Sequence, residues 1–124
     1  MPKRILVVDD EEMIVRMLET NLKRAGYEVI TAVNGRDGLE KAASDKPDLV
    51  LMDVQMPMMD GFAALEALKA TQETSAIPVV MLTSKSQESD LNQGLDSGAE
   101  FYVTKPVDPH DLLGLIERLF ASRE

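Results

Sequence analysis

The chain has 124 residues, of which 44% are apolar and 28% charged, which suits one soluble domain over residues 1–124 with a core at about 4–121. Thirteen basic against 22 acidic residues give a net charge of −9, which repels a phosphate backbone and argues against direct nucleic-acid binding. The absence of cysteine excludes disulfides and thiolate sites, and the short apolar segment near the N-terminus ends in acids, so we expect a cytoplasmic protein without a membrane span.

Five short apolar runs alternate with five segments of helical composition. The predicted strands are residues 5–8, 29–33, 49–52, 79–82 and 101–104. The predicted helices are approximately residues 12–25, 35–44, 61–71, 88–97 and 109–121. Asp108 and Pro109 have the chemistry of a helix start, and Gly26 and Gly98 follow predicted helix ends, where a left-handed residue is favoured.

This alternation predicts an α/β fold whose mostly parallel sheet is covered by helices on both faces. Buried strands are continuous apolar runs, whereas edge strands carry more polar residues. We therefore expect the runs 5–8, 49–52 and 79–82 at the centre of the sheet. The strand order 2-1-3-4-5 with right-handed crossovers meets this requirement.

Polar residues stand at the carboxyl ends of four predicted strands. Asp9 and Asp10 follow the first strand, Asp53 the third, Thr83 the fourth and Lys105 the fifth. In the predicted order these strands are neighbours, so the side chains converge on the edge of the sheet at which open α/β folds bind ligands. The winding of the chain reverses between the first and third strands, which places the predicted site between Asp10 and Asp53.

The residue types at this edge suit phosphoryl transfer. Three carboxylates together need a cation among them, and oxygen ligands favour Mg²⁺, which often completes its coordination with phosphate oxygens. Lys105 can supply a positive charge and Thr83 a hydroxyl group to the phosphoryl oxygens. Asp53 is the best-placed acceptor, and a carboxylate that takes a phosphoryl group becomes an acyl phosphate.

Five short motifs occur in order at the predicted strand ends. They are Val7-Val8-Asp9-Asp10, Met52-Asp53-Val54-Gln55-Met56-Pro57, Asp60-Gly61, Leu82-Thr83-Ser84 and Tyr102-Val103-Thr104-Lys105-Pro106. Together they resemble the receiver domain of bacterial two-component response regulators, of the single-domain chemotaxis or sporulation-relay type. The resemblance covers nearly the whole chain and implies a flavodoxin-like (βα)5 fold with a doubly wound sheet.

The resemblance also implies a donor and a metal. Asp53 would take its phosphoryl group from the phosphohistidine of a histidine kinase or histidine phosphotransfer protein. Asp10 and Asp53 would bind Mg²⁺ directly, Asp9 largely through water, and Gln55 through its backbone carbonyl group. The chain would be a signalling phosphoacceptor that loses its phosphoryl group slowly to water, not a metabolic enzyme.

A switch is implied as well. Thr83, Ser84 and Lys105 would contact the phosphoryl group, and Tyr102 would turn inward when the Thr83 hydroxyl group moves. The Lys105-Pro106 peptide is expected to be cis. Output would go to a downstream protein target, from a monomer or a weak phosphorylation-dependent dimer that stands alone or is a piece of a larger regulator.

Two other functions use similar residues. A haloacid-dehalogenase-type phosphohydrolase also needs an aspartate, Mg²⁺, a lysine and a threonine, but it has an Asp-x-Asp pattern after the first strand, where this chain has Asp9-Asp10. A flavodoxin-like cofactor carrier needs a phosphate loop rich in glycine, serine or threonine at that position. Taken singly, the acids Asp9 to Glu12 also fit the acidic start of a helix, Thr83 an ordinary strand end and Lys105 an ordinary surface lysine.

Two helices carry further hypotheses. The first has more apolar residues than one core-facing stripe needs, so part of it is expected at the surface, where it would dock the phosphodonor protein. These residues are Met13, Ile14, Val15, Met17, Leu18 and Leu22. The fourth, 88–97, has few apolar anchors and an interior glycine, which suits an element that a phosphoryl group can bias. Met56, Met58 and Met59 are interpreted as loop packing and His110 as a bystander.

Overall fold

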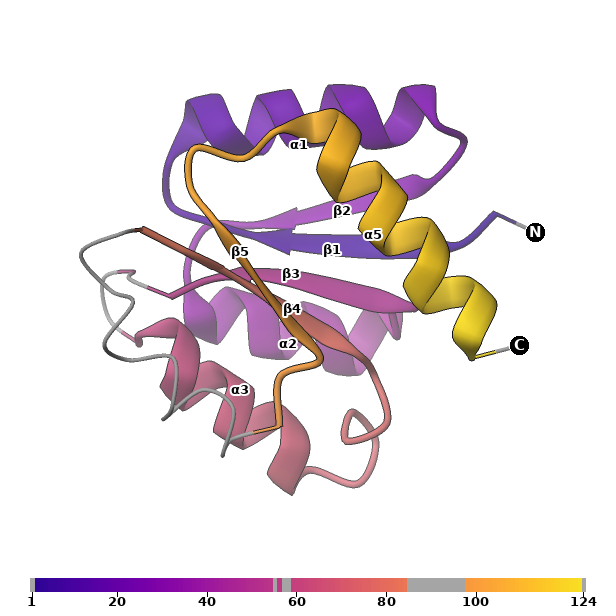
Figure 1. The fold of residues 1–124 in the computed structure, drawn as a ribbon. Coiled ribbons are helices and arrows are strands. Elements are labelled where there is room, and N and C mark those ends of the chain that lie inside the picture. The colour runs from indigo at the N-terminus through magenta and orange to yellow at the C-terminus, as the bar shows by residue number, and fades with distance from the viewer. Residues whose placement is uncertain (1, 55, 57–58, 85–97, 124) are drawn as a thin grey trace.

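The computed structural model describes residues 2–54, 56, 59–84 and 98–123, and Figure 1 shows its ribbon. The strands are β1 (Arg4–Val8), β2 (Glu28–Ala32), β3 (Leu49–Asp53), β4 (Val79–Thr83) and β5 (Phe101–Thr104). The helices in these ranges are α1 (Glu12–Arg24), α2 (Gly35–Asp45), α3 (Gly61–Ala70) and α5 (Pro109–Ser122). The predicted helix over 88–97 lies outside the described residues.

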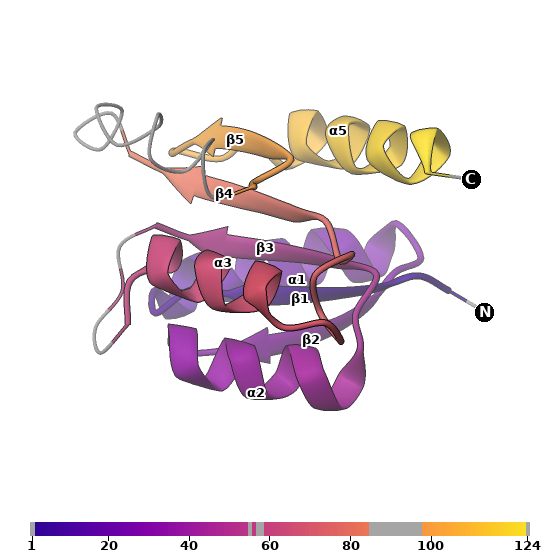
Figure 2. The same cartoon turned by 90° about the horizontal axis from the view of Figure 1, so that it is seen from below.

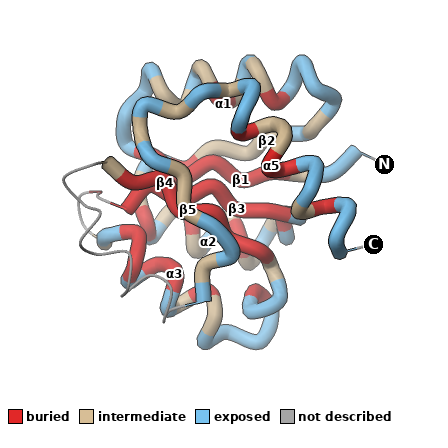
Figure 3. Tube along the Cα trace, viewed as in Figure 1, coloured by how far each residue is buried: buried red, intermediate tan, exposed pale blue. Residues whose placement is uncertain are grey.

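The five strands form one parallel sheet in the order β2-β1-β3-β4-β5, which confirms the predicted fold class and order. All residues of β3 and β4 are buried, as are the last four of β1, whereas β2 and β5 keep exposed or half-buried positions. This is the pattern expected for three central strands between two edge strands. Figure 3 shows the buried strands at the centre of the molecule.

Helices cover both faces of the sheet, with α1 and α5 on one side and α2 and α3 on the other (Figures 1 and 2). Side chains of successive strand residues point to opposite faces. In β1, Ile5 and Val7 belong to the core cluster under α1 and α5, and Leu6 and Val8 to the cluster under α2 and α3. Both clusters rest on the same central strands, so the carboxyl ends of those strands have a rigid support.

Short polar side chains start three of the helices. Asn34, Asp60 and Asp108 each accept a hydrogen bond from a backbone amide in the first turn of α2, α3 and α5, and Pro109 is the first residue of α5, as predicted. Gly26, which follows α1, has a φ of +99° that a residue with a side chain rarely adopts. The local signals in the sequence therefore set the helix ends.

One of the apolar residues of α1 lies at the surface, as the sequence predicts. Met13 is 85% exposed, whereas Leu18 and Leu22 are buried and Met17 is half-buried against the core under α1 and α5. Met56 is also buried in the core, as the packing interpretation requires. None of the helices in the described part of the chain combines the length and the apolar character needed to cross a membrane.

Candidate phosphoryl-transfer site

The candidate site lies at the carboxyl edge of the sheet, and neighbouring strands hold its residues in place. Asp9 directly follows β1, and its backbone amide donates to the carbonyl group of Ala32 at the end of β2, 3.2 Å away. Asp53 is the last residue of β3, and the next amide, that of Val54, donates to the carbonyl group of Leu82 in β4. The backbone of both aspartates is therefore fixed by the hydrogen-bond ladder of the sheet.

Three carboxyl groups meet at this edge. Carboxylate oxygens of Asp9, Asp10 and Asp53 lie within 4.8 Å of one another. Asp9 and Asp53 are only 1% and 4% exposed, whereas Asp10 is exposed. Burial raises the pKa of Asp9, although the amide of Glu11, 2.9 Å from its Oδ1, and the Lys105 ammonium act in the opposite direction. The cluster therefore holds its negative charge at a free-energy cost.

Lys105 lies among the carboxylates. Its Nζ is 3.1 Å from an oxygen of Asp9, 3.1 Å from one of Asp53 and 3.3 Å from Oε1 of Glu11, and its side chain is 14% exposed. Burial alone would lower the pKa of Lys105, but the carboxylates of Asp53 and Asp9 outweigh this effect and raise it. The ammonium group is therefore charged at neutral pH, beside the oxygen of Asp53. The Lys105-Pro106 peptide is cis, as expected.

Thr83 and Tyr102, two further predicted residues, lie on the neighbouring strands β4 and β5. Thr83 ends β4 and is 1% exposed, and its hydroxyl group donates to the carbonyl group of Ser84, 3.2 Å away. The Tyr102 side chain packs against the core under α2 and α3, and its hydroxyl oxygen is buried. The ring is thus already inward in this structure. Gln55 lies outside the described residues.

Sequence reasoning gave no site role to two residues that the structure places against the site. Glu11 contacts Lys105, although its position in an acidic run suggested only a helix start. Gly61 packs so closely on β3 that a Cβ atom there would lie 2.1 Å from the carbonyl oxygen of Asp53 and 2.8 Å from Cα of Val54. A glycine at the first position of a helix was the available signal for such a close approach.

The donor set fits a hard divalent cation. Two ligands of one Mg²⁺ ion are at most about 4.2 Å apart, twice the usual Mg–O distance. The oxygens of Asp9, Asp10 and Asp53 are close to this separation. One of the three residues is exposed, which leaves room for the waters that Mg²⁺ usually retains. Asp9, Asp10 and Asp53 can therefore hold such an ion after small side-chain movements.

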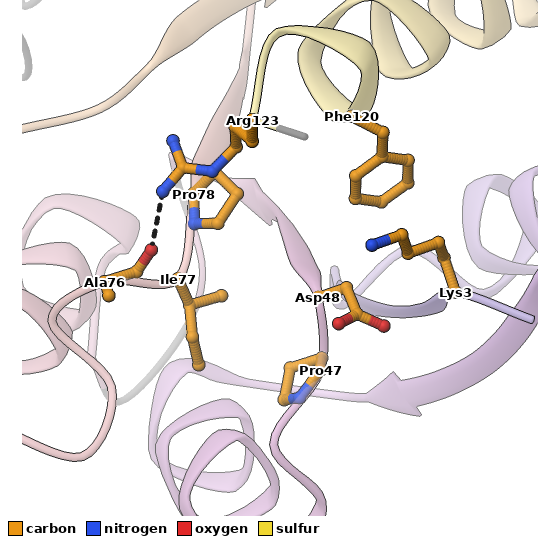
Figure 4. A pocket seen from close by; sticks show the side chains of 8 residues that line it. All are labelled: Lys3, Pro47, Asp48, Ala76, Ile77, Pro78, Phe120 and Arg123. Carbon is orange, nitrogen blue, oxygen red and sulfur yellow. Dashed lines mark hydrogen bonds between the residues drawn. The ribbon is translucent and has the colours of Figure 1, made fainter. Parts of the chain in front are cut away.

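A separate cavity lies at the opposite edge of the sheet (Figure 4). It has a volume of about 310 Å³, and the residues around it include Lys3, Asp48, Phe120 and Arg123. The Lys3 ammonium lies 5.4 Å from the centre of the Phe120 ring, and the Arg123 guanidinium donates to the carbonyl group of Ala76. None of the predicted site residues that the structure describes lines this cavity.

A family model for the response regulator receiver domain matches residues 5–117. The chain belongs to this receiver family. It is 46% identical to Protein PilH of Pseudomonas aeruginosa over 119 residues, which cover 96% of this chain and 98% of PilH. It is 44% identical to the transcriptional regulatory protein PhoP of Bacillus subtilis over its whole length but spans only 51% of PhoP. Receiver domains are signalling phosphoacceptors that interact with histidine kinases and downstream targets.

Solved receiver structures agree with the fold. The chemotaxis protein CheY4 of Vibrio cholerae superposes with a TM-score of 0.89 at 35% identity, covering 95% of this chain and 98% of that one. The receiver domain of the sensor histidine kinase PA1611 of P. aeruginosa has a TM-score of 0.87 at 26% identity, over 95% of this chain and 97% of that one. A magnesium ion is coordinated in the active-site cleft of that receiver, and the receiver family binds Mg²⁺ at this acidic site.

Proposed function

We propose that this protein is a phosphoacceptor that takes a phosphoryl group onto Asp53 from the phosphohistidine of a histidine kinase or a histidine phosphotransfer protein. A carboxylate oxygen of Asp53 attacks phosphorus, the P–N bond to the imidazole breaks, and the departing nitrogen keeps the electron pair. The observation that carries the proposal is the position of Asp53. It ends the central strand, 3.1 Å from a charged lysine and within an acidic cluster suited to a divalent cation.

Each residue around Asp53 has a role in the proposed transfer. Lys105 neutralises charge that develops on the phosphoryl oxygens, and Thr83, through its hydroxyl group, and Ser84 bind one of these oxygens. Asp10, Asp53 and the backbone carbonyl group of Gln55 would hold Mg²⁺ directly and Asp9 largely through water, and the ion would supply further positive charge near the same oxygens. The burial of Asp9, Asp53 and Thr83 supports these roles because it limits the movement of the groups.

The proposed output is a change of partner binding through Thr83 and Tyr102. The Thr83 hydroxyl group leaves the carbonyl group of Ser84 to bind the phosphoryl group, and the inward position of Tyr102 fills space beside β4. Thr83 pairs with Thr104 of β5, and Tyr102 pairs with Met81 of β4, so the two residues lie two positions apart on adjacent strands, which supports coupling between them. The strength of this coupling depends on how differently the two states bind a partner.

We further propose that residues 1–124 act as one receiver domain in the cytoplasm, as a monomer or a weak phosphorylation-dependent dimer. Its partners are a phosphodonor protein and a downstream target protein. Slow hydrolysis of the aspartyl phosphate returns the domain to its starting state and makes it a timed signal instead of a metabolic enzyme.

One experiment tests the proposed function directly. The protein and an Asp53→Ala variant are incubated with Mg²⁺ and acetyl phosphate or phosphoramidate, and the intact mass of each is measured. We expect a single added phosphoryl group on the wild type and none on the variant. Modification of both proteins, or of neither, contradicts the assignment of Asp53.

A further inference from the structure

Glu11 is a fourth carboxylate at the proposed phosphorylation site, and it reaches the site through Lys105. Its Oε1 lies 3.3 Å from the lysine Nζ, across a separation of 94 residues in the chain. The side chain of Glu11 is 59% exposed, whereas those of Asp9 and Asp53, which also pair with the ammonium group within the described residues, are almost completely buried. Glu11 is therefore the partner that Lys105 can exchange most easily.

The position of Glu11 in α1 is a second indication of a role at the site. Glu11 is the N-cap residue of α1, but its side chain makes no cap hydrogen bond. Helices α2, α3 and α5 begin with Asn34, Asp60 and Asp108, which do make such bonds. The first helix thus lacks a stabilising cap, and the side chain at that position contacts Lys105 instead. A locally unfavourable residue is expected where function determines the choice.

We propose that Glu11 is a positioning residue that competes with the phosphoryl group for Lys105, an inference that rests on the proposed phosphorylation of Asp53. The added phosphoryl group brings new negative charge beside the ammonium group, which must give up carboxylate partners in order to pair with it. Each carboxylate that holds Lys105 in the unmodified state therefore lowers the affinity of the site for a phosphoryl group. Glu11 sets this affinity without touching the reacting atoms.

Glu12 provides a matched control for the loss of one negative charge. It is the next residue in the chain and is also exposed, but its carboxylate pairs with Arg16 at 2.6 Å and not with Lys105. A general electrostatic effect on an anionic ligand predicts similar results for Glu11→Gln and Glu12→Gln. Competition for Lys105 predicts an effect of Glu11→Gln alone.

The test uses beryllofluoride, which binds the acceptor carboxylate as a stable mimic of the acyl phosphate. The wild type, Glu11→Gln, Glu11→Asp, Glu12→Gln and Asp53→Ala are titrated at saturating Mg²⁺ and followed by amide NMR. We expect Glu11→Gln to bind about two- to fivefold more tightly than the wild type, the range given by an exposed ion pair. Glu11→Asp should shift in the same direction, because its side chain is shorter by about 1.5 Å. Glu12→Gln should match the wild type.

The ¹⁵N signal of the Lys105 ammonium group gives a readout that a purely structural role of Glu11 would not change. Before beryllofluoride is added, this signal should shift in Glu11→Gln and stay in place in Glu12→Gln. Equal affinities of the wild type and Glu11→Gln, or equal gains in both Gln variants, would overturn the inference while leaving the proposed function intact. Absence of wild-type binding, or binding that survives Asp53→Ala, would instead overturn the proposed function.

Discussion

Replacing Gly61 by alanine tests whether the first turn of α3 fixes the position of Asp53. A Cβ atom at this position would lie 2.1 Å from the Asp53 carbonyl oxygen, whereas Cβ atoms essentially never come closer than 3.0 Å to another heavy atom. The gap between α3 and the end of β3 must therefore open by about 0.9 Å. The obstacle is backbone and not a flexible side chain, so it cannot simply rotate away.

The magnitude follows from this displacement. Inserting atoms into a packed contact usually costs about 1–3 kcal/mol, which for a domain of this size lowers the melting temperature by about 4 to 12 °C. A shift of about 1 Å in a reacting group can slow its reaction by roughly 10²-fold. Gly61→Ala should therefore be less stable and should also take a phosphoryl group from acetyl phosphate much more slowly.

Gly114 supplies the control, because it lies inside α5 and a Cβ atom there would meet nothing within 4 Å. Gly114→Ala should raise the stability by about 0.5–1 kcal/mol, since alanine loses less backbone entropy in a helix than glycine. Both variants are compared by thermal melting and by intact mass against time, well below the lower melting temperature. Equal stability of the two variants, or a wild-type phosphorylation rate in a destabilised Gly61→Ala protein, would refute the reasoning.

Three further outcomes are expected. Mg²⁺ at 100 times its dissociation constant should stabilise the wild type by about 2.7 kcal/mol, as measured by thermal melting. Asp10→Asn should lose most of this gain, whereas the control Asp45→Asn, at the last residue of α2, should keep it. The raised pKa of Asp9 means that its charged form opposes folding, so without divalent ions Asp9→Asn should be more stable than the wild type near neutral pH. That advantage should vanish below the ordinary value of 3.8, where the carboxyl group is protonated in both folded and unfolded states, and urea unfolding at several pH values measures it. Met13→Glu should slow phosphotransfer from a phosphohistidine protein and spare transfer from acetyl phosphate, because Met13 is 85% exposed; Met17 is half-buried and is the poorer choice.

The sheet and its carboxyl edge were predictable because buried strands have a recognisable apolar pattern in the sequence. Strands covered on both faces must be apolar at every position, so β3 and β4 stand out as unbroken runs. A polar or charged residue that ends a strand is expected at the carboxyl end of the sheet. This is why Asp53, Thr83 and Lys105 could be assigned to one place before their distances were known.

The contacts of Glu11 and Gly61 were not predictable in the same way. Four successive acids, Asp9 to Glu12, fit a helix start that favours negative charge, and nothing local separates Glu11 from Glu12. Only the three-dimensional structure shows that one of them reaches Lys105 and the other Arg16. The contact of Gly61 likewise depends on the path of the chain between β3 and α3, which hydrophobic patterns do not specify.

The balance of charge at the site indicates an order of events. Asp9, Asp10, Glu11 and Asp53 carry four negative charges against the single positive charge of Lys105, which leaves a net charge of −3 on these residues. Repulsion between such a cluster and an anionic phosphodonor is strong where the groups are buried. A divalent cation reduces the net charge to −1, so the donor should bind productively only after the cation. Phosphorylation by acetyl phosphate should then stop when the ion is chelated, even though Asp53 and Lys105 remain in contact.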